Sequence, residues 1–250
     1  MTDRTLPHCL FFDFDGTLSV AGAVSKANVD ALRRVQAAGH KIFLNTGRSR
    51  ANIPERAFGG IAWDGIVAGY SYAEARGTVV LEEHLPKEAL LKIKPFCDKY
   101  GFTSIIQGVR VAFTYDGKPA EPFGDDLNGY IEAHYDELRI TNLDIRGMAA
   151  WTGGDEFPGC WHICHEDYTE IIRRGFDKSS GIRAIAKHLG IPLERTVSFG
   201  DSNNDVDMLR CTGTSVIMHT SPAELDEIAD FRTESDENGV AEGIARLFFD

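Results

Sequence analysis

Residues 9–17 read Cys-Leu-Phe-Phe-Asp-Phe-Asp-Gly-Thr, and this stretch decides the fold. Its first four residues form a continuous apolar run, which is typical of a parallel strand buried on both faces. Two carboxylates, Asp13 and Asp15, follow where that strand would end. In an open α/β sheet, the loops at the carboxyl ends of the strands meet in one crevice. We therefore expect both carboxylates to lie in that crevice.

Strands and helices alternate at both ends of the chain. Further short apolar runs occupy residues 42–44, 66–68, 196–199 and 215–218. Helical apolar spacing follows Ser25, a residue type that often caps helices, and recurs over 182–189 before Gly190. This alternation predicts an α/β fold with a Rossmann-like, doubly wound parallel sheet.

The middle of the chain has a different pattern. We predict a helix over 87–100 and a strand over 109–115 with apolar residues at alternate positions. Residues 145–151 and 160–166 also look like strands. Such alternation is typical of an antiparallel sheet with one face packed on helices and one face open. We expect an inserted α+β cap domain over 85–174, with the core formed by 1–84 and 175–250. Candidate ligand contacts on the open face are Arg110, Thr114, Arg146 and His162.

Composition excludes several classes of partner. The 38 acidic and 26 basic side chains give a net charge of −12, which argues against binding to nucleic acids or to anionic membranes. No segment approaches the ~20 apolar residues of a membrane span, and no signal-peptide pattern is present. Five scattered cysteines suit a reducing compartment, so we expect a cytoplasmic protein. The sequence does not indicate an oligomeric state.

A second acidic loop follows the run over 196–199. Residues 200–205 read Gly-Asp-Ser-Asn-Asn-Asp, so Asp201 and Asp205 would join Asp13 and Asp15 in the crevice. Four carboxylates so close together repel one another by several kcal/mol in a partly buried site. A hard divalent cation removes this repulsion, and a set of oxygen ligands with room for waters and a phosphate suits Mg²⁺.

The same residues offer groups for phosphate chemistry. Asp13 and Asp15 are two apart, so on an extended segment they point the same way; one can attack as a nucleophile while the other transfers protons. Thr46 offers a hydroxyl after the strand over 42–44, and we expect the Gly47 N–H at the start of a helix, where phosphate binds readily. Lys178 begins the helix that ends near Gly190 and could place a positive charge on a phosphate.

In their order along the chain, these segments resemble the four motifs of the haloacid dehalogenase (HAD) phosphohydrolase superfamily. The motifs are Asp-x-Asp-Gly-Thr at 13–17, the threonine Thr46, the lysine Lys178 and Gly-Asp-x-x-Asn-Asp at 200–205. The tail Gly-Val-Ala at 239–241 also resembles the family, so the similarity covers nearly the whole chain.

The resemblance implies a role for each matching residue. Asp13 would be the nucleophile that forms an aspartyl-phosphate, and Asp15 the general acid and base whose backbone carbonyl joins the metal ligands. Thr46, Lys178 and Asn204 would hold the phosphoryl group, together with Gly47. Asp13 and Asp201 would bind Mg²⁺ directly, with Asp205 as a ligand or a water-bridged partner.

Motif spacing indicates the subclass. About 30 residues separate Asp15 from Thr46, too few for an inserted domain, whereas about 130 separate Thr46 from Lys178. A cap in that second interval resembles HAD subclass IIB, the Cof-type group, whose members are mostly phosphatases of sugar phosphates and other small phosphorylated metabolites. The pair Gly69-Tyr70 departs from the residues usual in the family after the third strand.

The sequence thus predicts a Mg²⁺-dependent phosphomonoester hydrolase acting on a small phosphorylated metabolite, foremost a sugar phosphate. A phosphomutase of the same subclass is an alternative, because it shares the phosphoenzyme. A phosphoaspartyl signalling or binding protein is another, because receiver domains also gather carboxylates, threonine and lysine at strand ends. Asp15 argues against the signalling protein, since it would hasten loss of the phosphoryl group.

Overall fold

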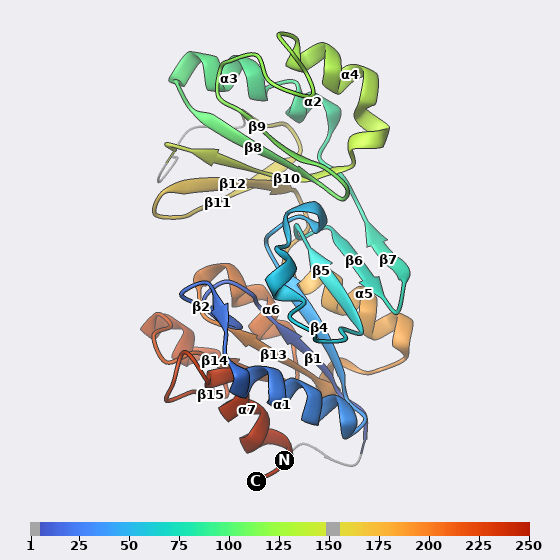
Figure 1. The fold of residues 1–250 in the computed structure, drawn as a ribbon, viewed down its shortest axis with the longest axis vertical. Coiled ribbons are helices and arrows are strands. Elements are labelled where there is room, and N and C mark those ends of the chain that lie inside the picture. Colours follow the sequence, from blue (N-terminus) through green and yellow to red (C-terminus); the bar gives the residue numbers. More distant parts are fainter. Residues whose placement is uncertain (1–5, 149–155) are drawn as a thin grey trace.

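A computed structural model describes residues 6–148 and 156–250 of the chain. These residues form two large sheets, each with its own helices, stacked along the long axis of the molecule, and one two-stranded hairpin (Figure 1). The larger sheet contains, in spatial order, β15 (Phe231–Arg232), β14 (Thr214–Ile217), β13 (Thr196–Gly200), β1 (Cys9–Phe12), β4 (Lys41–Thr46), β5 (Gly65–Ala68), β6 (Tyr72–Ala75) and β7 (Thr78–Glu82). All of its neighbouring pairs are parallel except β5–β6 and β6–β7. The predicted α/β core is confirmed.

Helices cover both faces of the large sheet. They are α1 (Lys26–Ala37), α5 (Lys178–Leu189), α6 (Val206–Cys211) and α7 (Gly239–Phe248). Successive side chains of β1 point to opposite faces, so Leu10 and Phe12 pack with residues of α1 and α7, whereas Cys9 and Phe11 pack with α5 and α6. All four side chains are fully buried. This explains why the strand has no polar position before Asp13.

The segment after β4 differs from the expectation. A hairpin of β2 (Ser19–Val20) and β3 (Ala23–Val24) follows the first acidic loop, but β4 is followed only by the short 3₁₀ helices η1 (Arg50–Asn52) and η2 (Glu55–Ala57). Pro54 separates these two turns and holds Ile53 in an extended conformation. The prediction that Gly47 lies at a helix N-terminus is therefore wrong, and Gly47 lies in a loop.

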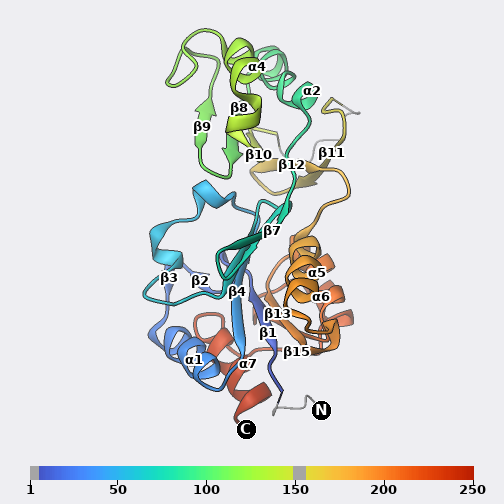
Figure 2. The same ribbon diagram turned by 90° about the vertical axis from the view of Figure 1, so that its right-hand side faces the viewer.

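The smaller sheet is antiparallel throughout. It contains, in spatial order, β11 (Cys160–Cys164), β12 (Tyr168–Arg173), β10 (Ile140–Arg146), β8 (Thr103–Gly108) and β9 (Ala112–Tyr115). The helices α2 (Lys87–Leu90), α3 (Ile93–Tyr100) and α4 (Leu127–Leu138) cover its outer face, and its other face is directed toward the core (Figures 1 and 2). This agrees with the predicted α+β cap.

Details of the cap differ from the sequence pattern. The helix expected over 87–100 is interrupted between α2 and α3, because Pro95 has no N–H to donate and is tolerated only near the start of a new helix. β10 begins at Ile140, not at residue 145, and residues 149–151 of the expected strand lie outside the described residues. The helix α4 and the strands β8 and β12 were not predicted.

The chain passes between core and cap twice, at residues 83–86 and 174–177. In the part of the chain that the structure describes, no helix combines the length and the apolar character needed to cross a membrane.

Candidate active site

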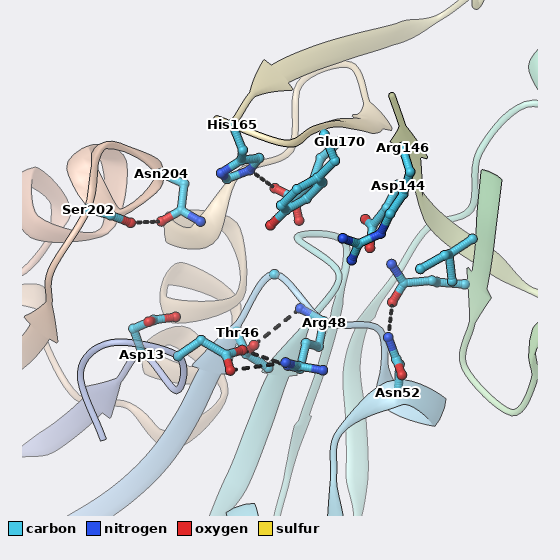
Figure 3. Close-up of a pocket in the computed structure, with 15 residues that line it drawn as sticks. Asp13, Thr46, Arg48, Asn52, Asp144, Arg146, His165, Glu170, Ser202 and Asn204 are labelled. Carbon is cyan, nitrogen blue, oxygen red and sulfur yellow. Dashed lines mark hydrogen bonds and ion pairs between the residues drawn. The ribbon is translucent and has the colours of Figure 1, made fainter. Parts of the chain in front are cut away.

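A cavity of about 590 Å³ lies between the carboxyl ends of the core strands and the open face of the cap sheet (Figure 3). Its core wall is formed by Asp13, Asp15, Thr46, Gly47, Arg48, Asn52, Ser202 and Asn204. Its cap wall is formed by Ile105, Gln107, Asp144, Arg146, His165, Tyr168 and Glu170. The two walls come from segments far apart in the sequence, and most of the lining side chains are polar.

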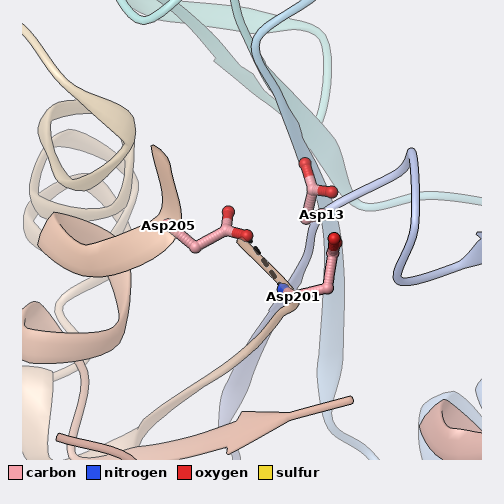
Figure 4. Close-up of side chains that lie close together, drawn as sticks. All are labelled: Asp13, Asp201 and Asp205. Carbon is pink, nitrogen blue, oxygen red and sulfur yellow. Dashed lines mark hydrogen bonds between the residues drawn. The ribbon is translucent and has the colours of Figure 1, made fainter. Parts of the chain in front are cut away.

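Three carboxylates lie close together where Asp13 lines this cavity; Figure 4 shows the three side chains. β1 and β13 are neighbours, with Phe12 paired to Phe199, so the loops that follow them begin side by side. One carboxylate oxygen from each of Asp13, Asp201 and Asp205 lies within 4.8 Å of the other two. The structure therefore brings together three of the four carboxylates that the strand-end argument placed in one group, from residues almost two hundred positions apart; Asp15 is not among them.

Lys178 is the cation buried among these carboxylates. Its Nζ lies 2.7 Å from Asp13 Oδ1 and 2.7 Å from Asp205 Oδ1, and only 1% of its side chain is exposed. α5 begins at this lysine because the Asp177 carboxylate caps the helix, accepting hydrogen bonds from the N–H groups of Ser179 and Ser180. Burial lowers the pKa of Lys178, but the two carboxylates outweigh it and leave that pKa above its ordinary value.

The single positive charge of Lys178 does not neutralise the three carboxylates of Asp13, Asp201 and Asp205. Burial, with the charge of Asp205 second, raises the pKa of the Asp201 carboxyl to about 6. Burial also raises the pKa of Asp13, which is 5% exposed; Lys178 opposes this effect, while Asp205 and Asp201 add to it. The uncompensated negative charge and the oxygen donors favour a hard divalent cation.

The carboxylates differ in how they are held. Both oxygens of Asp205 are engaged, Oδ1 by Lys178 and Oδ2 by the N–H groups of Asp201 and Ser202 at 2.9 and 3.1 Å. Asp201 Oδ1 accepts from the Thr17 hydroxyl at 2.7 Å. Asp201 Oδ2 lies against Gly16, where a Cβ would come within 2.4 Å of it. Asp205 thus orients the loop, whereas Asp201 contributes a carboxylate oxygen that lies close to both Asp13 and Asp205.

Asp15 stands apart from this group. Its side chain is half exposed, and Arg48 contacts it with two hydrogen bonds, Nε to Oδ2 at 2.6 Å and Nη2 to Oδ1 at 3.0 Å. The backbone N–H of Arg48 also donates to Thr46 Oγ1 at 3.2 Å. Sequence reasoning did not include Arg48 in the site, although its place two residues after Thr46 was a signal for it.

The four expected cap contacts lie in different places. Arg146 lines the cavity. Thr114 pairs with Ile105 and shares the open face but does not line the cavity, and Arg110 lies in the exposed turn between β8 and β9. His162 is exposed and pairs with Ile171, a residue of the helix-covered cap core, so it projects from the other face of the sheet.

Other cap residues reach the cavity that sequence reasoning did not single out as ligand contacts. Glu170 Oε2 accepts hydrogen bonds from the Tyr70 hydroxyl of the core and from His165 Nε2, the latter at 3.0 Å. The His165 ring stacks on Tyr168 with centroids 4.3 Å apart. Burial, together with the charge of Glu170, raises the pKa of Tyr70 well above its usual range. The alternation Asp144-Ile145-Arg146 was the available signal for Asp144, which lines this wall together with Glu170.

Comparison with known proteins identifies the class. The model of a family described as haloacid dehalogenase-like hydrolase matches residues 10–149 and 160–244, so the chain belongs to this family. The phosphatase YwpJ of Bacillus subtilis (strain 168) is 39% identical over 94% of this chain and 98% of its own length. The 5-amino-6-(5-phospho-D-ribitylamino)uracil phosphatase YitU of the same strain is 23% identical over 98% and 99%.

The structural comparison agrees. The solved structure of BT4131, a sugar phosphatase of HAD subclass IIB, superposes with a TM-score of 0.77 at 25% identity, covering 96% of this chain and 98% of that one. The expected place of the chain in subclass IIB, the Cof-type group, is confirmed, and the chain is a phosphatase of the HAD type.

Proposed function

We propose that this phosphatase is a Mg²⁺-dependent phosphomonoester hydrolase that acts on a small phosphorylated metabolite, foremost a sugar phosphate, through an aspartyl-phosphate on Asp13. The observation that carries this proposal is the position of Asp13. It is a nearly buried carboxylate that opens into the cavity, beside Lys178 and within reach of two further carboxylates.

The residues present suit Mg²⁺. Asp13 and Asp201 would hold it directly, the backbone carbonyl of Asp15 would join them, and Asp205 would act by orienting the loop or through a water. These are hard oxygen donors, and they leave room for waters and a phosphate oxygen. When bound, Mg²⁺ would neutralise charge on the phosphoryl group and on the carboxylates around it.

The residues of the chain would then act in two steps. Asp13 attacks phosphorus, the bond from phosphorus to the leaving oxygen breaks, and Asp15 gives that oxygen its proton. Asp15 next takes a proton from a water molecule that attacks the aspartyl-phosphate, releasing inorganic phosphate and restoring the Asp13 carboxylate. Lys178 and Thr46 would hold the phosphoryl oxygens, with Gly47 and Asn204 supporting them from the cavity wall.

The size and lining of the cavity support a small substrate. A volume of about 590 Å³ falls in the range of small-molecule sites. The cap closes over the phosphate position, so the remainder of the substrate would contact cap residues. BT4131 is a sugar phosphatase and YitU acts on a phosphorylated ribityl compound, which favours hydroxylated substrates for this chain also.

The test uses p-nitrophenyl phosphate. We expect Asp13→Asn to lower turnover by about 10³-fold or more, and EDTA to abolish it until Mg²⁺ is restored. Activity that survives either treatment would remove this mechanism. Release of inorganic phosphate at the rate of substrate loss separates a hydrolase from a phosphomutase, and a phosphoenzyme that persists for minutes in Mg²⁺ would indicate a signalling protein.

A further inference from the structure

Asp144 presents a carboxylate oxygen that no group within residues 6–148 or 156–250 satisfies. It lies on β10, on the open face of the cap sheet, and lines the cavity close to Arg146 (Figure 3). Only 8% of the residue is exposed. Its Oδ1 is buried and has no hydrogen-bond partner in the described part of the chain. Buried polar atoms are almost always hydrogen-bonded, so this exception requires an explanation.

The described neighbours of Asp144 form no hydrogen bond with its Oδ1. Glu170 lies directly opposite it on β12 and repels it. Arg146 is two residues along the same strand, and its guanidinium lies 5.1 Å from the centre of the Tyr168 ring. A carboxylate kept for stability would be paired, since an unpaired buried charge is costly. The arrangement instead suits a ligand that brings its own hydrogen-bond donor.

We propose that Asp144 is a specificity-determining residue that accepts a hydrogen bond from a hydroxyl group on the leaving group of the substrate. This inference rests on the proposed hydrolase function. Above about pH 7 Asp144 is ionised, so its carboxylate only accepts hydrogen bonds. A guanidinium only donates, and a hydroxyl satisfies both because it donates one hydrogen bond and accepts two. A cationic amine would satisfy Asp144 but would be repelled by Arg146 two residues away.

A site of this kind discriminates strongly between substrates that carry the hydroxyl group and substrates that lack it. A substrate that lacks the hydroxyl leaves the buried carboxylate oxygen unsatisfied, which is the case in which hydrogen-bonding sites reject analogues most effectively. The phosphate position is formed by core residues, so an ester without such a hydroxyl would still reach Asp13. Asp144 should therefore affect the choice among substrates more than the chemistry at phosphorus.

The experiment compares substrates across variants of the full chain with Mg²⁺. The panel contains glucose 6-phosphate, ribose 5-phosphate and glycerol 1-phosphate, with p-nitrophenyl phosphate as the ester that lacks hydroxyls. For the best hydroxylated substrate, we expect Asp144→Ala to lower kcat/KM about 100-fold, at least ~30-fold more than for p-nitrophenyl phosphate. Asp144→Asn, which keeps an acceptor oxygen, should lose less. Asp136→Asn, an exposed carboxylate on α4, is the matched control and should change neither.

Monodeoxy analogues of the best substrate identify the hydroxyl. Wild-type enzyme should lose at least ~10-fold in kcat/KM when one particular hydroxyl is removed, and Asp144→Ala should lose almost nothing further at that position. Equal losses on all esters, or a lowered melting temperature that accompanies them, would assign Asp144 a structural role and overturn the proposal. So would a wild-type enzyme that hydrolyses p-nitrophenyl phosphate but prefers no hydroxylated ester. If no ester were hydrolysed at all, the proposed function itself would fail.

Discussion

The contact between Arg48 and Asp15 holds the proposed general acid in one orientation. A planar guanidinium that donates two hydrogen bonds fixes the plane of a carboxylate, which a lysine cannot do. The backbone of Arg48 is tied to Thr46, so the orientation of Asp15 depends on the same loop that would hold the phosphate. Arg48 therefore acts here as a positioning residue.

We predict that Arg48→Lys lowers kcat about 10- to 100-fold for an alkyl phosphate, the range expected when a charge-assisted hydrogen bond is lost. The loss should be smaller for p-nitrophenyl phosphate, whose leaving oxygen needs little protonation. Steady-state kinetics on both esters measures the difference. A uniform loss would mean that Arg48 does not act through Asp15.

The buried carboxyl of Asp144 makes stability depend on pH. Burial, with the charge of Glu170 second, raises its pKa to about 7, although Arg146, His165 and Arg48 oppose this. Between the ordinary value near 4 and about 7, the folded state keeps a proton that the unfolded state has released. Stability is therefore lost as pH rises through this window, by a few kcal/mol in all.

We predict that Asp144→Asn is more stable than the wild type, with an advantage that is about 2–3 kcal/mol larger at pH 8 than at pH 5. Urea unfolding of both proteins at the two pH values measures this difference. The other titratable groups are the same in both proteins, so their contributions cancel when the two free energies of unfolding are subtracted. An advantage that did not grow with pH would show that Asp144 stays ionised throughout this range in the folded protein.

At the scale of elements, the core could be predicted because its signals are local. The apolar run before Asp13 and the acidic loop after β13 each lie within about ten residues, and parallel topology then requires the two loops to meet. The cap wall could not be predicted in the same way. Asp144 and Glu170 become neighbours only through the register of β10 and β12, which no local pattern specifies.

Asp177, the N-cap residue of α5, connects the stability of this helix with catalysis, because the helix begins at Lys178. We predict that Asp177→Ala lowers the free energy of unfolding by about 1 kcal/mol, as loss of an N-cap usually does, and also lowers kcat. Ser25→Ala is the matched control. It removes the N-cap of α1, which lies away from the site, and should lower stability by a similar amount with kcat unchanged. Chemical unfolding and saturation kinetics test both variants. If Asp177→Ala had the same kcat as Ser25→Ala, the N-cap of α5 would not contribute to catalysis.

In the molecule as a whole, core and cap meet through specific contacts around the cavity. Besides the bond from Tyr70 to Glu170, Asn142 Nδ2 donates to the Gly47 carbonyl at 3.2 Å, and Asn52 donates to Gln107 at 2.8 Å. The pair Gly69-Tyr70, which departs from the family pattern, lies at this contact. Sequence alone could not show why, because the reason is the close approach of a strand about seventy residues away.

Gly69 offers a test of whether this closed arrangement is needed for turnover. Its φ is +54°, and a Cβ there would come within 2.4 Å of Thr141 Oγ1 and 2.8 Å of Asn142 Oδ1, both on the cap strand β10. Gly77 has a φ of +79° with nothing within 4 Å, so Gly77→Ala carries the backbone strain alone.

We predict that both alanine variants lose about 1 kcal/mol of stability from strain, and that Gly69→Ala also loses at least ~10-fold in kcat/KM because the cap can no longer seat over the cavity. Gly77→Ala should keep wild-type kinetics. Thermal unfolding and kinetics on one hydroxylated phosphate ester measure both effects. If Gly69→Ala kept full activity, the contact between cap and core would not be part of the working state, and the cavity walls described above would have to come together in another way.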